Sequence, residues 1–329
     1  MIQVAILGAA HPHVSYALDE LAAREDCVLA GVAEPDPAMR AAYLPGLGGA
    51  PLYDSPADLL ADRAVDVALV AGVYRERGSA VLAALEAGAH VIADKPLCTS
   101  LDELDLIEQR AAQTDRHVCI VFEKRFHPVT RAVRRLLGEG ELGELALIAS
   151  TGPHKLNLPS RPPWFLQRQT YGGIAGDLPV HDIDLALLLA GATSGTVCAQ
   201  TGNARRAEHP NFDDHVAVLL RAGATTATIE ANWLAPQASE VHGHYRMRLT
   251  GSEGTAELDW AYGSLTVETH GRARRAIDLP DPVRPAAFFF DAVATGSEPE
   301  ITTAQSLLAT RVALLAQESA DHGGEQRHW

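Results

Sequence analysis

The sequence predicts an α/β protein with an N-terminal doubly wound parallel sheet and a C-terminal α+β domain, whose sheet is open and mostly antiparallel. Three observations predict this arrangement. Short apolar runs alternate with amphipathic stretches up to residue 122. Beyond it, strand-like segments follow one another across glycine turns. The chain also has 329 residues, more than one core usually holds. We therefore expect one domain at 1–122 and a second at 123–329.

The first domain is predicted from apolar runs with few polar interruptions, which is typical of strands buried on both faces of a parallel sheet. The expected strands are 2–7, 28–33, 67–70, 90–93 and 118–122. The expected helices between them are 14–23, 57–62, 78–87 and 101–114. Ser100 and Glu103 form a capping-box pattern at the start of the last helix.

The second domain is predicted to begin with a helix at 128–137 and to contain another that starts near Asp177. Consecutive strands joined by tight turns indicate antiparallel pairing. These strands are expected at 196–201, 215–220, 225–232, 245–250, 255–258 and 264–268. Helices near 285–295 and 303–320 end the pattern, and only 322–329 is expected to be frayed.

The composition excludes several classes of function. A net charge of −15 makes nucleic-acid binding a poor hypothesis. The four cysteines are far apart and form neither a disulfide framework nor a zinc motif. No apolar run has the length of a membrane span, and the N-terminus lacks the basic region of a signal peptide. We therefore expect a cytoplasmic protein that binds no membrane.

The loop after the first strand contains a weakened dinucleotide-binding fingerprint. Gly8 is kept, Ala10 stands at the second glycine position and His13 at the third. Pro12 can occupy a first helical turn, so that the N–H groups after His11 would point at a pyrophosphate. These five residues are predicted to bind the cofactor, although an ordinary strand–turn–helix with two incidental histidines would have the same sequence.

An acidic residue follows the second predicted strand. Glu34 lies 26 residues after Gly8, where a carboxylate can accept hydrogen bonds from ribose hydroxyls and would repel a 2′-phosphate. No arginine directly follows it. The sequence therefore favours NAD over NADP, with a solvent-facing carboxylate as the alternative.

Lys95 follows the strand at 90–93, where ligands bind in open α/β sheets. Pro96 stiffens the turn, and the bond between them is a candidate for the cis form. A lysine at this position can donate to a substrate hydroxyl and offset charge on its oxygen. A single lysine after a strand is also a common surface charge.

A second group of polar residues follows the glycines at 172, 173 and 176. Asp177 and His181 are four residues apart, so that on one helix they would lie within reach of each other. A carboxylate that orients a histidine suits it to proton transfer near neutral pH. The alternative is a capping aspartate followed by a core histidine.

These segments together resemble the Gfo/Idh/MocA family, the glucose–fructose oxidoreductase and inositol dehydrogenase group. The matching segments are AILGAA, GVAEPDP, AALEAGAHVIADKPLCTS, EKRFHPVTRAVRRLLGEGELGEL, YGGIAGDLPVHDIDLALLL and the stretch from FFFDAVATGSEPE to QESA. The sequence departs from the family in its less complete glycine loop and in DKP where EKP is usual. The resemblance implies a Rossmann domain, an α/β domain with an open sheet, NAD(P) as cofactor, and sugars, inositols or related alcohols as substrates.

The resemblance also implies site residues. It assigns the catalytic lysine to Lys95 and the Asp/His pair to Asp177 and His181, and it places Arg125 near the cofactor and substrate cleft. Trp164 and Tyr171 precede the catalytic helix and are expected to line the substrate pocket, with core packing as the alternative.

A metal site is not predicted. His11 and His13 could converge on an ion with His154 or His181, but no dense set of ligand residues surrounds them in the sequence.

The sequence thus predicts an NAD(H)-dependent oxidoreductase that interconverts an alcohol and a ketone on a sugar or polyol. Two alternatives stay open: a redox-neutral glycosidase or epimerase that recycles its cofactor, and a non-catalytic ligand sensor. A homodimer or homotetramer through the open sheet is also expected, because large exposed apolar faces usually bind a partner.

Overall fold

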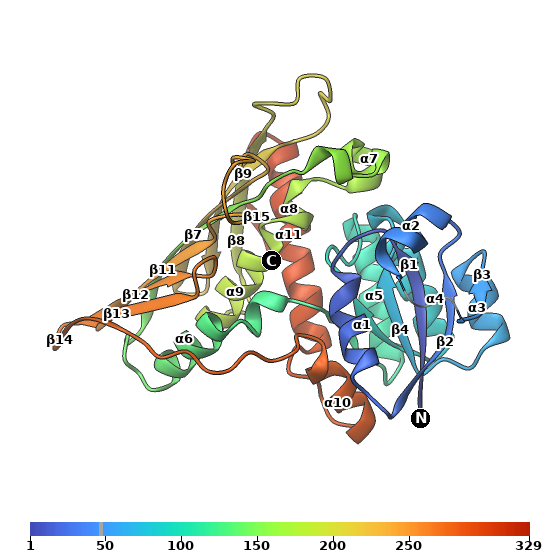
Figure 1. Ribbon diagram of the computed structural model, residues 1–329. Helices are drawn as coiled ribbons and strands as arrows, with labels where there is room; N and C mark the ends of the chain where they lie inside the picture. The colour runs from blue at the N-terminus through green and yellow to red at the C-terminus, as the bar shows by residue number, and fades with distance from the viewer. Residues whose placement is uncertain (46–48) are drawn as a thin grey trace. The chain divides into compact units, whose positions relative to one another are not determined.

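The computed structural model describes residues 1–45 and 49–329 (Figure 1). The described chain divides into two compact units. The first comprises Met1–Val121, Gln169–Gly172 and Arg284–Thr310. The second comprises Phe122–Arg168, Gly173–Val283 and Arg311–Trp329. The predicted domain boundary after residue 122 stays a prediction, and in the structure residues 169–172 and 284–310 group with the first unit.

Within the described residues, the first unit contains a parallel sheet of six strands in the order β3-β2-β1-β4-β5-β6. This is the strand order of the doubly wound dinucleotide-binding fold. The strands are β1 (Ile2–Ala9), β2 (Cys27–Ala33), β3 (Leu52–Tyr53), β4 (Val67–Ala71), β5 (His90–Ala93) and β6 (Val118–Ile120). All five residues of β4 are buried, as expected for a strand covered on both faces.

Helices lie on both faces of the first sheet, with α1 on one side and α3 and α4 on the other (Figure 1). The helices that belong wholly to this unit are α1 (Val14–Ala22), α2 (Pro37–Tyr43), α3 (Pro56–Asp62), α4 (Tyr74–Glu86), α5 (Leu101–Gln113) and α10 (Ala287–Thr295). The predicted cap of α5 is confirmed, since Ser100 Oγ accepts the Glu103 N–H at 3.3 Å. The sequence interpretation missed α2 and the short β3.

The helix α10 explains why residues 284–310 belong to the first unit. Phe289 and Phe290 are fully buried in one apolar cluster with Val4, Ile6 and Leu69 of the central strands. Aromatic side chains contribute a large part of core burial, so these two phenylalanines fasten the returning chain to the first sheet.

Within the described residues, the second unit contains a nine-stranded sheet with the order β14-β13-β12-β11-β7-β10-β9-β8-β15. Its strands are β7 (Leu145–Pro153), β8 (Gly195–Gly202), β9 (His215–Ala222), β10 (Thr225–Asn232), β11 (Arg246–Gly251), β12 (Gly254–Asp259), β13 (Ser264–Thr269), β14 (Arg272–Ala276) and β15 (Arg327–His328). Only β7 and β10 pair in parallel among these strands of the described chain, so the mostly antiparallel sheet is confirmed. The expected frayed end at 322–329 is wrong in part, because β15 pairs with β8.

Short helical segments and longer helices complete the second unit. They are η1 (Glu123–Arg125), α6 (Pro128–Gly138), η2 (Leu158–Ser160), η3 (Pro163–Leu166), α7 (Arg168–Tyr171), α8 (Ile174–Asp177), α9 (Val180–Ala190) and α11 (Thr303–Asp321), of which α7 and α11 are shared with the first unit. The helix α9 packs on β7, β9 and β10, and α6 packs on β12 and β13.

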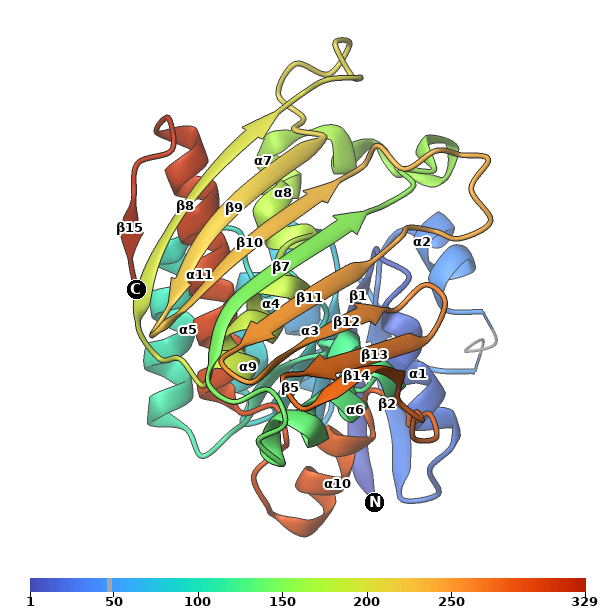
Figure 2. The ribbon, with the colours of Figure 1, turned by 90° about the vertical axis from the view of Figure 1, so that its left-hand side faces the viewer.

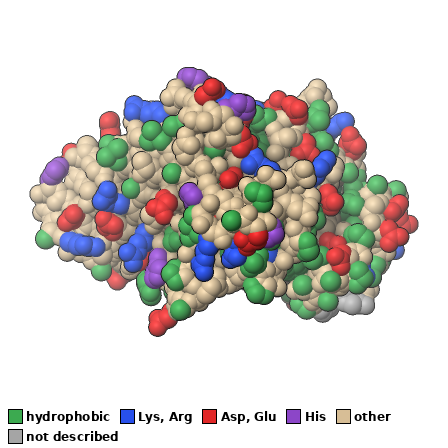
Figure 3. Space-filling view, turned by 90° about the horizontal axis from the view of Figure 1, so that it is seen from above, with side chains coloured by type: hydrophobic (Ala, Val, Ile, Leu, Met, Phe, Trp, Pro, Cys, Tyr) green, Lys and Arg blue, Asp and Glu red, His purple; other side chains and the backbone are tan. Residues whose placement is uncertain are grey.

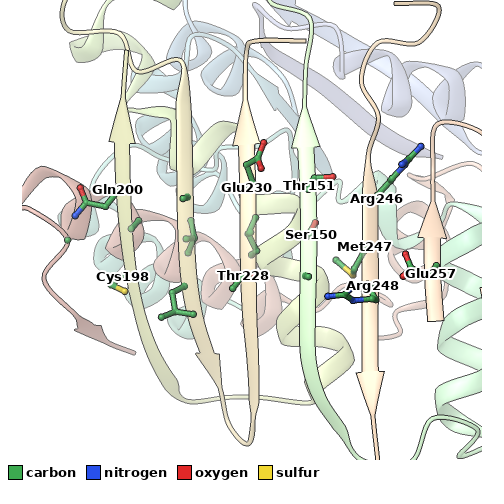
Figure 4. Close-up of a pocket in the computed structure, with 17 residues that line it drawn as sticks. Ser150, Thr151, Cys198, Gln200, Thr228, Glu230, Arg246, Met247, Arg248 and Glu257 are labelled. Atoms are coloured by element: carbon green, nitrogen blue, oxygen red, sulfur yellow. The ribbon is translucent and has the colours of Figure 1, made fainter. Parts of the chain in front are cut away.

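The other face of this sheet carries no helix in the part of the chain that the structure describes (Figure 2). Residues of β9 alternate between buried and exposed along the strand, as one covered face requires. The open face is hollowed by a pocket of about 860 Å³, which side chains such as Cys198, Thr228 and Arg248 line (Figure 4). Arg248 lies in register with Glu257 of the neighbouring strand.

One face of the molecule carries side chains of both charges. Acidic and basic side chains are interspersed on the face shown in Figure 3, although the net charge of the chain is −15. None of the described helices is long and apolar enough to cross a membrane.

Candidate active site

The end of β1 and the loop that follows it have the geometry of a dinucleotide turn. Gly8 has a φ of +79°, and a Cβ on it would lie 2.5 Å from the Cα of Gly72. Only glycine combines this backbone conformation with so close an approach of two strand ends. Ala10 is buried and donates its N–H to the Ala71 carbonyl at 2.8 Å. Gly8 and Ala10 therefore shape the crossing from β1 to α1, as the fingerprint predicts.

Both histidines of this loop point at one carboxylate. His11 Nδ1 lies 2.8 Å from Asp94 Oδ2, and His13 Nδ1 lies 3.2 Å from Asp94 Oδ1. Pro12 lies in the turn before α1, which begins at Val14, and not inside the helix as the sequence suggested. The two imidazole rings meet edge to face, with centroids 4.5 Å apart. The histidines are thus part of a built cluster and are not incidental.

Burial sets the charge of this cluster. It lowers the pKa of His11 to about 3, against the opposing attraction of Asp94, so His11 is neutral at pH 7. Burial alone would raise the pKa of Asp94, but its interactions with His11, Arg77 and His13 hold that pKa well below its usual range. The ligand atoms of His11, His13 and Asp94 lie within 4.8 Å of one another, a set that could hold a metal ion. Arg77 already supplies a positive charge 3.0 Å from Asp94 Oδ2, which disfavours a second cation there.

Glu34 directly follows β2, as predicted, and its carboxylate is buried. Its Oε2 accepts the Ala9 N–H at 2.8 Å, and Oε1 accepts the Asp36 N–H at 3.0 Å. These bonds place a fixed negative charge beside the Gly8 loop. Arg40 Nη1 donates to the Glu34 carbonyl oxygen, so a guanidinium also lies near this strand end.

Lys95 lies at the carboxyl end of β5 in the same unit as the Gly8 loop, and it is buried. The bond between Lys95 and Pro96 is cis. Arg77 is fully buried and donates from Nη1 to the Lys95 carbonyl at 2.5 Å. Lys95 is therefore fixed through its backbone by a residue that the sequence interpretation missed, since α4 was expected to begin only at Gly78.

The segment before the predicted catalytic helix packs in the first unit. Tyr171 is 2% exposed and stacks on Tyr74, with ring centroids 5.7 Å apart. Gly172 has a φ of +82°, and a Cβ on it would lie 2.6 Å from Thr99 Cγ2. This packing agrees with the alternative that Tyr171 is a core residue. The expected contact of Tyr171 with a substrate stays a prediction. Trp164 is half-buried beside Phe165.

The second unit holds Asp177 and His181, both buried. They do not share one helix as expected: Asp177 is the last residue of α8, whereas His181 lies in the first turn of α9, whose N-cap is Pro179. Because α8 and α9 are separate, the four-residue spacing along the sequence no longer fixes their distance. A carboxylate that lies beside the imidazole is that of Glu123, with Oε2 at 3.4 Å from His181 Nδ1.

Arg125 is buried and engaged by a carboxylate of its own unit. Its Nε donates to Asp184 Oδ2 at 2.7 Å and its Nη2 to Asp184 Oδ1 at 2.6 Å. Burial raises the pKa of Asp184, although the neighbouring Arg125 charge acts to lower it. This bidentate pair fastens η1 to α9 and so supports the helix that carries His181. The predicted contact of Arg125 with the cofactor stays a prediction.

Two family models match this chain, one in its N-terminal part and one in its C-terminal part. Residues 2–122 match the oxidoreductase family with the NAD-binding Rossmann fold, and residues 130–257 match the GFO/IDH/MocA C-terminal domain. The chain belongs to the Gfo/Idh/MocA oxidoreductase family. It is accordingly an NAD(P)-dependent oxidoreductase, and the resemblance stated from the sequence is confirmed.

Individual relatives of this Gfo/Idh/MocA chain are distant. A D-xylose 1-dehydrogenase (NADP(+)) of Haloferax volcanii is 28% identical, over 97% of each chain. An inositol 2-dehydrogenase of Corynebacterium glutamicum is 28% identical, over 58% of this chain and 55% of its own. A crystal structure of a putative oxidoreductase from Erwinia carotovora atroseptica has a TM-score of 0.90 at 27% identity and covers 97% of this chain and 99% of its own. A levoglucosan dehydrogenase in complex with NADH and levoglucosan, 20% identical, shares the fold with a TM-score of 0.83 over 99% of each chain.

The first unit fits the dinucleotide that the Gfo/Idh/MocA family binds. The positive φ of Gly8 leaves its backbone bare at the strand end, and the fixed Glu34 carboxylate follows the second strand, as the ribose-binding position requires. Arg77, Asp94 and Glu123 are the polar residues of these sites that sequence reasoning missed. Asp94 could have been found from its place before Lys95, whereas Arg77 lies among other charged residues and gives no comparable signal.

Proposed function

We propose that this protein is an NAD(H)-dependent dehydrogenase that interconverts a secondary alcohol and a ketone on a sugar, an inositol or a related polyol. The observation that carries the proposal is the buried Lys95 at the carboxyl edge of the same sheet whose first strand ends in the Gly8 turn. The family supplies the redox class, and its named sugar and inositol dehydrogenases supply the substrate class.

A bound nicotinamide dinucleotide supplies the two-electron chemistry of this reaction. We assign to His181 the removal of the proton from the substrate hydroxyl, because an imidazole beside a carboxylate is suited to general base catalysis near neutral pH. The ammonium of Lys95 donates a hydrogen bond to the same oxygen and offsets its developing negative charge. Asp177, a buried carboxylate four residues before His181 in the sequence, is assigned to bind a neighbouring hydroxyl or to orient His181.

The preference for NAD over NADP rests on Glu34. Its carboxylate is held by two backbone N–H groups beside the cofactor loop, where a 2′-phosphate would meet a fixed negative charge. The positive charge of Arg40 would favour a 2′-phosphate, but its guanidinium donates to the backbone carbonyl oxygen of Glu34. We therefore expect a lower KM for NAD than for NADP.

Two variants test the catalytic assignment. Lys95→Met and His181→Ala are each expected to lower kcat by about 10²-fold or more while the protein still binds NADH, measured by fluorescence. A panel of sugars, polyols and their keto forms with NAD and NADH identifies the substrate class. Unchanged turnover in both variants would reject the assignment. Product formation without net NADH would instead indicate a redox-neutral reaction.

We also propose that two copies of the chain associate through the open face of the nine-stranded sheet. Leu147 and Leu219 are about half exposed on this face, and a sheet face of this kind is a common site of self-association. Light scattering tests the proposal: a dimeric or tetrameric mass is expected, and Leu219→Asp should shift it toward the monomer. A monomeric mass for the unchanged protein would contradict it.

A further inference from the structure

Arg77 is the centre of a buried network behind the catalytic lysine. Its Nε donates to the Gly72 carbonyl at 2.8 Å, and its Nη1 donates to the carbonyls of Lys95 at 2.5 Å and Pro96 at 3.2 Å. Its Nη2 donates to Asp94 Oδ2 at 3.0 Å. One fully buried guanidinium thus holds the strand ends of β4 and β5 together at the backbone of Lys95.

Asp94 extends this network to the cofactor loop. Its backbone N–H donates to the Val70 carbonyl at 2.9 Å, which fixes the residue at the end of β5. Its two carboxylate oxygens then face His11 Nδ1 and His13 Nδ1 of the loop after β1. The loop that replaces two fingerprint glycines with bulkier residues is therefore fastened to the residue immediately before Lys95.

We propose that Arg77 and Asp94 are positioning residues for Lys95, and that His11 and His13 fasten the dinucleotide loop to the same carboxylate. The placement of the catalytic ammonium and the binding of the cofactor are then set together by Asp94. This inference rests on the proposed function, because it assigns the network a role at a cofactor loop and at a catalytic lysine.

The charges in this cluster are suited to holding the loop after β1 against Asp94. Arg77 supplies the counter-charge of the Asp94 carboxylate, and buried His11 is neutral at pH 7, so it contributes a directed N–H donor and no second charge. A hydrogen bond to a buried charged group is stronger than a neutral one and costs more to break. His13 is the outer member of the cluster, with 25% of its side chain exposed.

The restored glycine gives the sharpest test. His13→Gly recreates the third fingerprint glycine, so an incidental histidine would allow NADH to bind as well or better after the change. A link from His13 to Asp94 predicts the opposite result: the Kd for NADH, measured by fluorescence titration, should rise at least fivefold. His270→Ala, an exposed histidine of the second unit, is the control and leaves the Kd unchanged.

A double-mutant cycle separates the link from independent effects. Asp94→Ala is expected to raise the Kd for NADH at least fivefold, and Asp94→Ala with His13→Gly should bind within twofold of Asp94→Ala alone, because the second change removes a bond already lost. Arg77→Lys keeps the charge but loses most of the donors, and should lower kcat about tenfold with little change in the Kd for NADH. Circular dichroism verifies that each variant is folded.

Each outcome decides between the interpretations. Tight NADH binding by His13→Gly, or additive effects in the cycle, would overturn the link and leave the proposed function intact. Loss of NADH binding on dialysis against a chelator, restored by Zn²⁺, would overturn it in favour of a metal site. If the unchanged protein binds neither NADH nor NAD, the proposed function fails first and the inference fails with it.

Discussion

The imidazole of His181 has Glu123 as its carboxylate neighbour, with 3.4 Å between His181 Nδ1 and Glu123 Oε2. The two residues lie in different elements, Glu123 in η1 and His181 in the first turn of α9. The two atoms lie at ion-pair distance without the geometry of a hydrogen bond to each other, so the carboxylate acts on the ring through its charge. The orienting role that the sequence assigned to Asp177 therefore has a second candidate in Glu123.

We predict that Glu123→Gln lowers kcat by about 10- to 100-fold, which is part of the roughly 10²–10⁴-fold that general acid–base catalysis contributes. The reason is that the amide keeps the shape of the side chain but loses the charge that faces the imidazole. Steady-state kinetics measures kcat, and fluorescence titration should show an unchanged Kd for NADH. A kcat equal to that of the unchanged protein would show that Glu123 has no part in orienting His181.

We predict that Glu34→Gln raises the ratio of kcat/KM for NADP to that for NAD by about tenfold, or about 1.4 kcal/mol. The negative charge that would face a 2′-phosphate is lost, while Arg40 stays nearby. Asp54→Asn, a carboxylate that is also in the first unit but outside the loop, is the control. A ratio unchanged by Glu34→Gln would remove Glu34 from cofactor selection.

We predict that Gly8→Ala abolishes measurable NADH binding. A Cβ would lie 2.5 Å from the Gly72 Cα, and an L-residue at positive φ costs a further 1–2 kcal/mol or so. Because the obstructing atom belongs to the backbone, the loop must move for the alanine to fit. Gly88→Ala also places alanine at positive φ, but with no atom within 4 Å, and should leave NADH binding intact. Equal binding by both variants would contradict the close approach of the two strand ends.

We predict that Asp184→Ala lowers the free energy of unfolding by about 3–5 kcal/mol, because it leaves the Arg125 charge buried without its bidentate partner. The double variant Arg125→Met with Asp184→Leu removes both charges and should recover much of the loss. Urea denaturation measures both variants. A loss below about 1 kcal/mol in the single variant would show that water or another group compensates the charge.

We predict that the protein loses stability as the pH falls from about 6.5 toward 4, in part through His11. The pKa of His11 is lowered from 6.5 to about 3 by burial, so the unfolded chain binds a proton in this window that the folded chain does not. The expected contribution is about 1–2 kcal/mol between pH 7 and pH 5. His11→Asn should flatten this part of the stability curve, measured by denaturation at each pH. An equally steep curve in the variant would assign the acid sensitivity to other groups.

Local patterns predicted the architecture well. The buried runs gave the central strands to within two residues at most of their ends, and β5 and β10 match their expected bounds. The interpretation failed where the signal was weak or distant. No strand was expected at β7, because its buried and exposed residues do not alternate strictly. Arg77 was missed because α4 begins at Tyr74, four residues before the expected start. The return of Phe289 and Phe290 to the first core could not be inferred, because no local pattern states which sheet a helix will cover.

The sequence by itself determined the class of fold, the family, and the positions of Gly8, Glu34 and Lys95 at strand ends, because a strand's period and its flanking residues are local properties. Only the tertiary structure decided which side chains share a carboxylate. His11 and Asp94 are 83 residues apart in the sequence, and Glu123 and His181 are 58 apart, yet each pair is in close contact. Such pairs depend on how strands and helices pack, and this is a property of the whole core that no short segment encodes.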